Sequence, residues 1–238
     1  VIIIFITLLL PLAIVWLIGG SGEGQSPIES GTVSVYVSEE DCVKDMDINE
    51  YLKCVVAAEM PADFEEEALK AQAVAARTYL YSHIAESHNG AAICTDSTHC
   101  QAYISEDKRR ESWGAGAEEN WNKISTAVDE TTGQIMTYND EIISAVFHST
   151  SSGITESAVD VWGADVPYLQ SVASTGDEES PKYHSELTLS EQEFKNIAEE
   201  KIDGVDWNNG LVSNINRSNA GGIVTLDVGG VNIKGTEF

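Results

Sequence analysis

The feature that most constrains the fold is an uncharged apolar run over residues 1–18, in which nothing is more polar than Thr7. An α-helix of this length spans about 27 Å, close to the hydrocarbon thickness of a bilayer. A cleaved signal peptide is the alternative, although its apolar part usually covers about 7–15 residues and ends at a small-residue cleavage site. The sequence therefore predicts a transmembrane helix at 1–18, a flexible Gly/Ser-rich linker at 19–31 and an extracytoplasmic domain at 32–238.

Acidic residues outnumber basic residues, 39 against 13, and give the chain a net charge of −26. Affinity for nucleic acids comes largely from Lys and Arg side chains that neutralise phosphates, and anionic lipid surfaces attract the same cations. The charge therefore excludes nucleic acid as the expected partner. With 42% hydrophobic residues, the chain nevertheless has the composition of a folded protein.

Two helices are predicted early in the folded part. Asp47 begins a capping pattern, the apolar positions of the first helix run to Val56, and Pro61 ends it. The second helix is predicted from about residue 65 to residue 87, because the acidic residues at its start favour the positive end of the helix dipole. Its buried stripe is predicted to consist of Leu69, Ala73, Ala76 and Leu80.

Strands are predicted from alternating or apolar segments at 33–37, 134–138, 142–147, 169–172 and 222–231. One further helix is predicted from its cap, Ser190, to Lys201, with Phe194 and Ile197 facing inward. The predicted fold class is α+β, in which the early helical hairpin packs on a mostly antiparallel, strand-rich region.

Two imidazoles and two thiols lie close together in the sequence: His88, Cys94, His99 and Cys100. Zn²⁺ prefers nitrogen and sulfur ligands of this kind, and four of them close a structural site. The spacing is not that of a standard zinc finger, and neighbouring ligands at 99 and 100 require a bent backbone. A Cys94–Cys100 disulfide therefore remains the alternative in an oxidising compartment. Cys54 is predicted to be a small buried apolar residue, and Cys42 has no assigned role.

One carboxylate, Glu59, is singled out by its position. It follows the apolar run 55–58 and immediately precedes Met60 and the helix-breaking Pro61. Partial burial and the negative end of the helix dipole both favour the neutral form of its carboxyl group. A carboxyl group that is protonated near neutral pH is what a general acid requires. The alternative is a solvent-exposed Glu without a function.

Two cations are candidates for the same site. Lys70 and Arg77 are seven residues apart and therefore lie within about 20° of the same helical face. This face returns toward Glu59 if residues 61–64 form the turn of a helical hairpin. Two cations there would orient the acid or bind substrate. Ordinary ion pairing, for example between Lys70 and Glu66, is the alternative.

A hydroxyl-rich loop at 149–152 follows a predicted strand, and Trp162 and Tyr168 come shortly after it. Hydroxyl groups such as those of Ser149 and Ser151 act as both donors and acceptors. Together with nearby aromatic rings they suit a carbohydrate ligand, which needs many polar partners. The alternative is a polar turn beside two core aromatic residues.

Two segments resemble the signature of a known family. Residues 55–62, VVAAEMPA, and 67–79, EALKAQAVAARTY, are similar to the stage II sporulation protein D family, which comprises membrane-anchored lytic transglycosylases of endospore-forming bacteria. Shorter matches in the family's order occur at 95–96, 100–103, 149–153, 162, 167–169 and 180–183. The resemblance implies a lyase that cleaves peptide-stripped peptidoglycan strands between N-acetylmuramic acid and N-acetylglucosamine and leaves a 1,6-anhydro product.

The resemblance also implies roles for individual residues. Glu59 matches the catalytic acid/base, and Lys70, Arg77 and Tyr168 match positions in or near the cleft. Some members of the family hold a zinc ion beside the cleft through His and Cys, which favours zinc over a disulfide at the four-residue cluster. Glycan binding as a non-catalytic scaffold and a zinc-dependent cell-wall amidase activity are the alternative functions.

The implied partners are glycan strands, a peptidoglycan amidase and a multi-pass membrane protein of the engulfment complex. The implied location is the mother-cell membrane at the engulfing septum. Two departures accompany the resemblance. Family members continue into a segment with a Gly-His-Gly-type motif, so a further segment is expected after Phe238. Gln170 stands where many relatives carry a Lys, so one substrate contact is expected to be lost.

Overall fold

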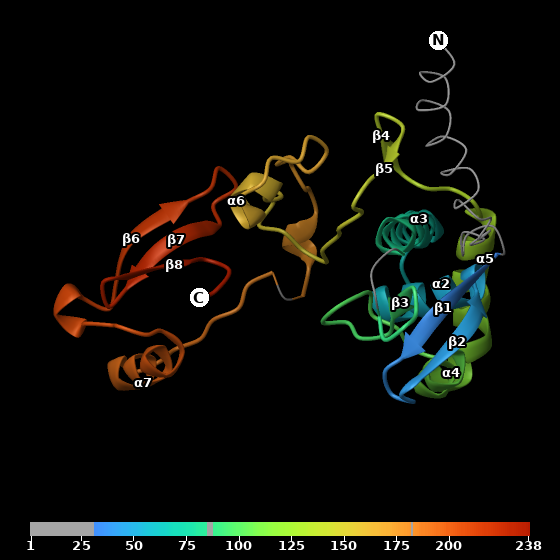
Figure 1. Cartoon of the computed structure of the whole chain (residues 1–238), viewed down its shortest axis with the longest axis horizontal. Helices are drawn as coiled ribbons and strands as arrows, with labels where there is room; N and C mark the ends of the chain where they lie inside the picture. Colours follow the sequence, from blue (N-terminus) through green and yellow to red (C-terminus); the bar gives the residue numbers. More distant parts are fainter. Residues whose placement is uncertain (1–30, 85–87, 182) are drawn as a thin grey trace, which may run out of the picture. The chain divides into compact units, whose positions relative to one another are not determined.

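The computed structural model describes residues 31–84, 88–181 and 183–238 (Figure 1). The predicted transmembrane helix at 1–18 and nearly all of the predicted linker lie outside these residues. Within the described part of the chain, no helix is both long and apolar enough to cross a membrane. The chain divides into two compact units, and the boundary between them falls after Val146.

The first unit combines a small sheet with helices. Its elements are β1 (Thr32–Val37), β2 (Cys42–Asp47), α2 (Ile48–Glu59), α3 (Glu66–His83), β3 (Ile93–Cys94), α4 (Glu106–Trp113), a 3₁₀ turn (Gly114–Gly116), α5 (Ala117–Glu130), β4 (Thr137–Tyr138) and β5 (Glu141–Ile142). The larger sheet has the order β2-β1-β3. β1 and β2 form an antiparallel hairpin, whereas β3 runs parallel to β1, with Val35 opposite Ile93.

Helix α2 begins and ends where the sequence predicts. The Asp47 carboxylate accepts hydrogen bonds from the backbone N–H groups of Asn49 (2.8 Å) and Glu50 (3.2 Å). This satisfies N–H groups that have no partner inside the first turn of a helix. The helix ends at Glu59 because Pro61 has no N–H group and its ring clashes with a continuing helix.

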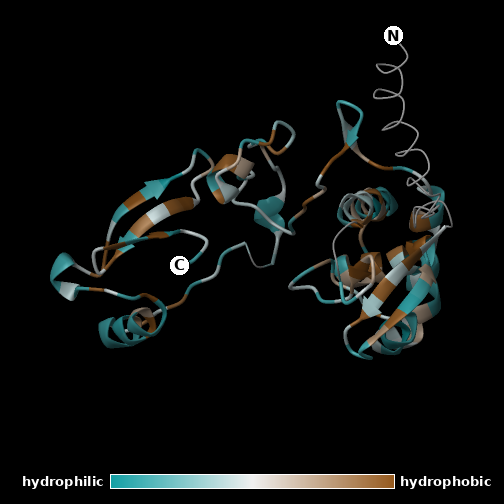
Figure 2. Ribbon diagram, viewed as in Figure 1, coloured by the Kyte–Doolittle hydropathy of each residue, from teal (hydrophilic) through white to brown (hydrophobic). Residues whose placement is uncertain are grey.

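The core of the first unit is formed by α2, α3, α5 and the β2-β1-β3 sheet. The predicted stripe on α3 is fully buried, which confirms that prediction: Leu69, Ala73, Ala76 and Leu80. Helix α5 contributes buried residues at helical spacing: Trp121, Ile124, Ala127 and Val128. In Figure 2 these helices carry both brown and teal residues, whereas α4 is mainly teal and buries none of its residues.

The second unit contains α6 (Ala158–Trp162), a 3₁₀ turn (Asp177–Glu179), α7 (Glu191–Lys201), a second 3₁₀ turn (Trp207–Asn209), β6 (Val212–Arg217), β7 (Ile223–Val228) and β8 (Val231–Lys234). The three strands form an antiparallel sheet in the order β6-β7-β8. Ser190 caps α7 in a full capping box with Glu193, as the predicted helix requires. Ile197 is half exposed, so its predicted inward orientation is wrong.

The mixed α+β class and its antiparallel strands are confirmed, but several details differ from the prediction. The single strand predicted at 222–231 is divided by a turn at residues 229–230 into β7 and β8, and β2 and β6 were not predicted. Helices α4 and α5 were not predicted. The predicted strands at 134–138 and 142–147 reduce to the two-residue pair of β4 and β5, and 169–172 forms no strand. Within the first unit, the helical hairpin packs on α5 and the β2-β1-β3 sheet.

Candidate active site and metal centre

Glu59 lies in a cavity of about 520 Å³ at the end of α2. The cavity is lined by residues 58–63 together with Arg109, Trp113 and Asn120. The Glu59 side chain is half-buried, and its Oε1 accepts a hydrogen bond of 2.9 Å from the backbone N–H of Ala102. The predicted partial burial is therefore confirmed, and the carboxylate is held in one orientation by the main chain of a loop 43 residues away in sequence.

The break in the chain after Glu59 shapes this cavity. Met60 adopts an extended conformation, and its N–H group still bonds to the Val56 carbonyl (3.0 Å). Pro61 then begins a tight turn, which closes with a hydrogen bond from the Phe64 N–H group to the Pro61 carbonyl. Glu59 is thus the last residue of α2 and lies at the start of the turn that connects α2 to α3.

The cation of this cavity is Arg109, which sequence reasoning missed. Its guanidinium lies 4.9 Å from the centre of the Trp113 ring. The Nε atom of Arg109 is buried and has no hydrogen-bond partner among the described residues, and no described carboxylate pairs with the side chain. An unpaired buried donor costs about 1–3 kcal/mol, so such groups call for an explanation. The signal in the sequence was the basic run 108–110 in a strongly acidic chain.

Lys70 and Arg77 share one face of α3, as predicted, but that face meets the end of α5. The Arg77 guanidinium donates to the carbonyls of Thr131 (2.7 Å) and Val128 (3.1 Å) and to Oδ1 of Asn49 (3.1 Å). Asn49 lies at the start of α2, ten residues and therefore about 15 Å of helix rise from Glu59. The expectation that this face returns toward Glu59 is wrong.

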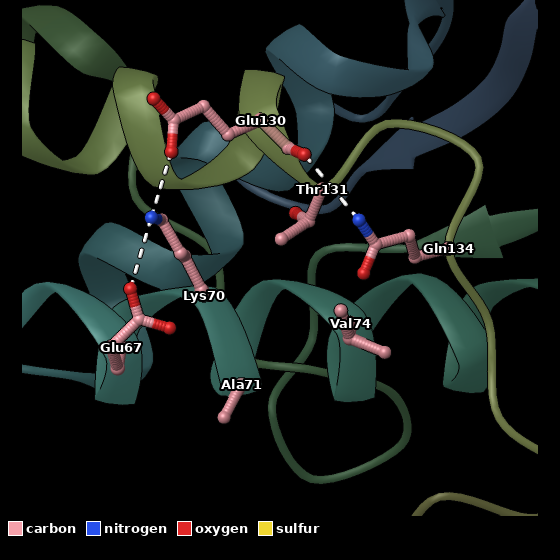
Figure 3. Close-up of a pocket in the computed structure, with 7 residues that line it drawn as sticks. All are labelled: Glu67, Lys70, Ala71, Val74, Glu130, Thr131 and Gln134. Atoms are coloured by element: carbon pink, nitrogen blue, oxygen red, sulfur yellow. Dashed lines mark hydrogen bonds and ion pairs between the residues drawn. The ribbon is translucent and has the colours of Figure 1, made fainter.

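Lys70 lines a second, separate cavity of about 420 Å³ between α3 and the end of α5 (Figure 3). Its ammonium pairs with Glu66 (2.8 Å), Glu67 (3.1 Å) and Glu130 (2.7 Å). These carboxylates, Glu130 foremost, raise the pKa of Lys70 well above its usual value. The ion pairing that the sequence left as an alternative is present, including the pair with Glu66.

The four side chains of the His/Cys cluster bring two sulfur and two nitrogen atoms close enough together to surround one metal ion. Zn–S bonds of about 2.3 Å and Zn–N bonds of about 2.0–2.1 Å give tetrahedral edges of about 3.8 Å (S–S), about 3.5 Å (S–N) and about 3.3 Å (N–N). In the structure, Cys94 Sγ and Cys100 Sγ are 3.3 Å apart, which is shorter than the expected S–S edge, and the Nδ1 atoms of His88 and His99 are 3.2 Å apart, which matches the N–N edge. Three sulfur–nitrogen distances are 3.4–3.5 Å.

The donor set therefore fits a four-coordinate zinc ion, and all four ligand atoms lie within 4.8 Å of one another. The bent backbone that neighbouring ligands need is a turn in which the N–H groups of His99 (3.1 Å) and Cys100 (2.7 Å) bond to the Asp96 carbonyl. The sulfurs of Cys94 and Cys100 are 3.3 Å apart, whereas a disulfide bond requires a distance of about 2.05 Å, so these two residues do not form the alternative disulfide.

A single residue separates the His/Cys cluster from the residue that donates to the Glu59 carboxylate. Cys100 belongs to the cluster, and Ala102 donates to Glu59. Between them, the buried side chain of Gln101 donates through Nε2 to the Ala76 carbonyl of α3 (3.3 Å). A metal ion at the cluster would thus fix the loop whose main chain orients the acid.

The candidate sugar-binding residues Ser149, Ser151 and Tyr168 belong to the second unit. The Ser151 hydroxyl (2.5 Å) and N–H group (2.9 Å) donate to the Asp177 carboxylate, and the hydroxyl is the main reason that the pKa of Asp177 is lowered. Ser151 lines a cavity of about 380 Å³ with Thr150, Ser152, Tyr183 and His184. Ser149 is exposed on the same loop and does not line it.

Tyr168 is half-buried in a turn that follows α6, outside the 380 Å³ cavity. Gln170, at which the loss of one substrate contact is expected, donates through its amide to the Val166 carbonyl (2.8 Å) and to Asp165 (3.1 Å). The side chain at 170 therefore stabilises its own turn.

A family model described as "Stage II sporulation protein", SpoIID, matches residues 36–138. This chain carries a SpoIID domain. The matched stretch runs from β1 to β4 and contains both Glu59 and the His/Cys cluster. The resemblance drawn from the sequence motifs is confirmed.

Proteins similar to this chain extend the SpoIID match beyond residue 138. Stage II sporulation protein D of Bacillus subtilis (strain 168) is 39% identical over 190 residues, which cover 77% of this chain and 55% of that protein. Stage II sporulation protein D of Bacillus amyloliquefaciens is 35% identical over 218 residues, which cover 90% and 62%. A Bacillus subtilis protein named amidase enhancer is 38% identical over 143 residues, which cover 60% and 17%. The chain thus spans somewhat over half the length of the two sporulation proteins.

Proposed function

We propose that this chain is a membrane-anchored lytic transglycosylase that cleaves peptide-stripped peptidoglycan strands during engulfment in sporulation. The observation that carries the proposal is the half-buried Glu59 carboxylate, held by the Ala102 N–H group in a cavity of about 520 Å³. The SpoIID domain and the relatives named stage II sporulation protein D support it.

In the proposed reaction, protonated Glu59 donates its proton to the glycosidic oxygen between N-acetylmuramic acid and N-acetylglucosamine. The bond from that oxygen to C1 of the muramyl residue breaks as an oxocarbenium-like centre develops. The Glu59 carboxylate then takes the proton of the muramyl C6 hydroxyl group, whose oxygen closes onto C1. The product is a 1,6-anhydro sugar, and no water is consumed.

One carboxylate suffices for this chemistry because the nucleophile belongs to the substrate. Intramolecular attack gains from a high effective molarity, and no second acid has to position a water molecule. Asp63 lines the same cavity and favours a second candidate function, hydrolysis of the same bond by a pair of carboxylates. The two reactions differ by one molecule of water in the product.

We further propose that His88, Cys94, His99 and Cys100 hold a zinc ion. Four protein ligands leave no open position on a tetrahedral ion, so this zinc is structural. Its contribution is to fix the loop that ends in Ala102, and the acid–base chemistry remains with Glu59. A zinc-dependent amidase needs an open position, which this ligand set does not offer.

Among the other candidate residues, Lys70, Tyr168, Ser149 and Ser151 remain proposed contacts to the glycan. Arg77 is proposed to be structural, because its donors are taken by backbone carbonyls and Asn49.

The proposed setting is the mother-cell membrane at the engulfing septum, with residues 1–18 as the anchor. The proposed partners are a peptidoglycan amidase, which removes the peptides first, and a multi-pass membrane protein of the same complex. The similarity to a protein named amidase enhancer supports the link to an amidase.

The deciding experiment is digestion of peptide-stripped strands by the wild type and by Glu59→Gln, with product masses measured. Glu119→Gln is the matched control, because this exposed residue loses the same charge outside the cavity. We expect anhydro products from the wild type and the control and none from Glu59→Gln. Cleavage by Glu59→Gln contradicts the proposal and favours the scaffold or the amidase, and products heavier by one water favour hydrolysis. Loss of activity on chelation together with full activity of Glu59→Gln would identify a metal-dependent enzyme instead.

A further inference from the structure

We infer that Arg109 binds a free carboxylate of the substrate and thereby selects muramyl residues from which the peptide has been removed. This inference rests on the proposed function, because it concerns the same cavity. Removing the peptide turns the amide on the lactyl group of N-acetylmuramic acid into a carboxylate. A stripped strand therefore carries a negative charge at each muramyl residue, where an intact strand carries a neutral amide and a long substituent.

The first observation is that Arg109 forms no ion pair with the described residues, whereas the two adjacent cations, Lys108 and Arg110, do. On the same helix, Lys108 pairs with Glu39, and Arg110 pairs with Glu106 (2.6 Å). Arg109 pairs with no carboxylate among the described residues, although the chain has 39 acidic residues. Of the three cations, only Arg109 lines the cavity that contains Glu59.

The second observation is that the guanidinium is held in place before any ligand arrives. It stacks over the Trp113 ring at 4.9 Å, and Trp113 in turn lies 6.5 Å from the buried Trp121. A cation over an indole face is attracted by the ring, and the stacked side chain has already lost part of its freedom. A planar guanidinium fixed in this way offers parallel N–H donors to a carboxylate, the geometry that Arg binds best.

The third observation concerns charge. A net charge of −26 repels a polyanionic strand at long range, but charges farther apart than about 8 Å are largely screened at physiological ionic strength. The charged groups that line the cavity therefore decide recognition, and these are Glu59, Asp63 and Arg109. Arg109 is the one cation among the described residues of that lining. A cavity of about 520 Å³ also lies in the range that holds small ligands.

Binding is the direct test, and it uses the full chain with Glu59→Gln to prevent cleavage. The probes are a peptide-stripped muramyl oligosaccharide and the same oligosaccharide with its lactyl carboxylates converted to methylamides. We expect Glu59→Gln to bind the free-carboxylate form about 10- to 100-fold more tightly, in keeping with a hydrogen bond to a charged group. Adding Arg109→Gln is expected to abolish this preference without weakening binding of the methylamide form.

Lys108→Gln in the Glu59→Gln background is the matched control. It removes the same charge one residue away, from an exposed side chain outside the cavity, so the preference is expected to persist. If circular dichroism shows that Arg109→Gln does not fold, Arg109→Lys takes its place in the binding test. It keeps the charge but lacks the planar donor pair, so we expect it to lose most of the preference.

The inference is overturned if Glu59→Gln binds both probes equally, or if Arg109→Gln (or Arg109→Lys in its place) keeps the full preference. Failure of the proposed function gives a different result, namely no strand cleavage by the wild type in a parallel assay. The comparison of the two probes still decides the role of Arg109 in that case.

Discussion

Arg77 is expected to stabilise the fold rather than to contact the substrate, and Arg77→Met separates the two roles. Only 1% of the side chain is exposed. Its guanidinium holds the carbonyls of Val128 and Thr131, which belong to the last turn of α5 and its cap. A helix end of this kind has carbonyls without N–H partners and a negative dipole, and both are satisfied by a cation.

The expected loss of stability follows from these contacts. Hydrogen bonds to a charged group contribute about 1.5–3 kcal/mol each, but three of them do not add fully because the Met side chain and nearby groups rearrange. Removing one partner from a buried charged network typically costs about 3–5 kcal/mol. We therefore expect Arg77→Met to lower the free energy of unfolding by about 3–5 kcal/mol, a large share of the 5–15 kcal/mol of a typical domain.

Urea denaturation followed by circular dichroism measures this loss, and Lys70→Met is the matched control. Lys70 contacts the same end of α5 from the same face of α3, but its ion pairs are accessible to solvent. We therefore expect Lys70→Met to lower the free energy of unfolding by less than about 1 kcal/mol. Strand cleavage is measured on the same variants. A stable but inactive Arg77→Met would refute this reasoning and return Arg77 to the substrate cleft, as the family resemblance implies.

Three further predictions concern the metal centre, the remaining thiols and the second unit. Cys100→Ser is expected to lose most bound zinc and to melt at a lower temperature, measured by elemental analysis and calorimetry; wild-type zinc content in the variant would argue against the site. Burial raises the pKa of Cys54 to about 11, so about one molecule in a thousand carries its thiolate at pH 8, and mass spectrometry should find Cys42 alkylated much faster. Because the pKa of Asp177 is lowered in the folded state, its stabilising effect is complete above the pKa of 3.8 expected for an Asp in the unfolded chain, and it disappears as the pH falls through the folded-state pKa. Ser151→Ala should therefore destabilise the protein near neutral pH and much less in strong acid, and an NMR titration should show the pKa of Asp177 rising; an unchanged pKa would exclude the hydroxyl as its cause.

Much of the first unit could be predicted from local sequence signals. The Asp47 cap, the break at Pro61 and the buried stripe of α3 depend on residues within one or two helical turns. The position of Glu59 in a partly buried site followed from the same break. The His/Cys cluster could also be predicted, because its four side chains lie within 13 residues of the sequence, from His88 to Cys100.

Other features depend on contacts that no local pattern encodes. Helix α5 carries buried residues at 121, 124, 127 and 128, a helical spacing that was present in the sequence and overlooked. Helix α4 buries no residue, so periodicity could not have revealed it. The sequence predicts Arg77 as a cation near Glu59, whereas the structure places Arg109 there. This difference results from the positions at which α4 and α5 pack. The apolar segment 142–147 predicts one strand, but only its first residue, Ile142, belongs to β5, and both Ile142 and Phe147 are exposed.

The contact between Ala102 and Glu59 has a consequence for mutagenesis. A backbone N–H group is retained when a side chain is replaced by any residue other than proline. An alanine scan of the cavity would therefore keep this hydrogen bond and would underestimate its contribution to the orientation of the Glu59 carboxylate. Ala102→Pro is the substitution that removes the N–H donor. Residues 101–105 form neither helix nor strand, so the orientation of the Glu59 carboxylate depends on the path of the main chain through this segment.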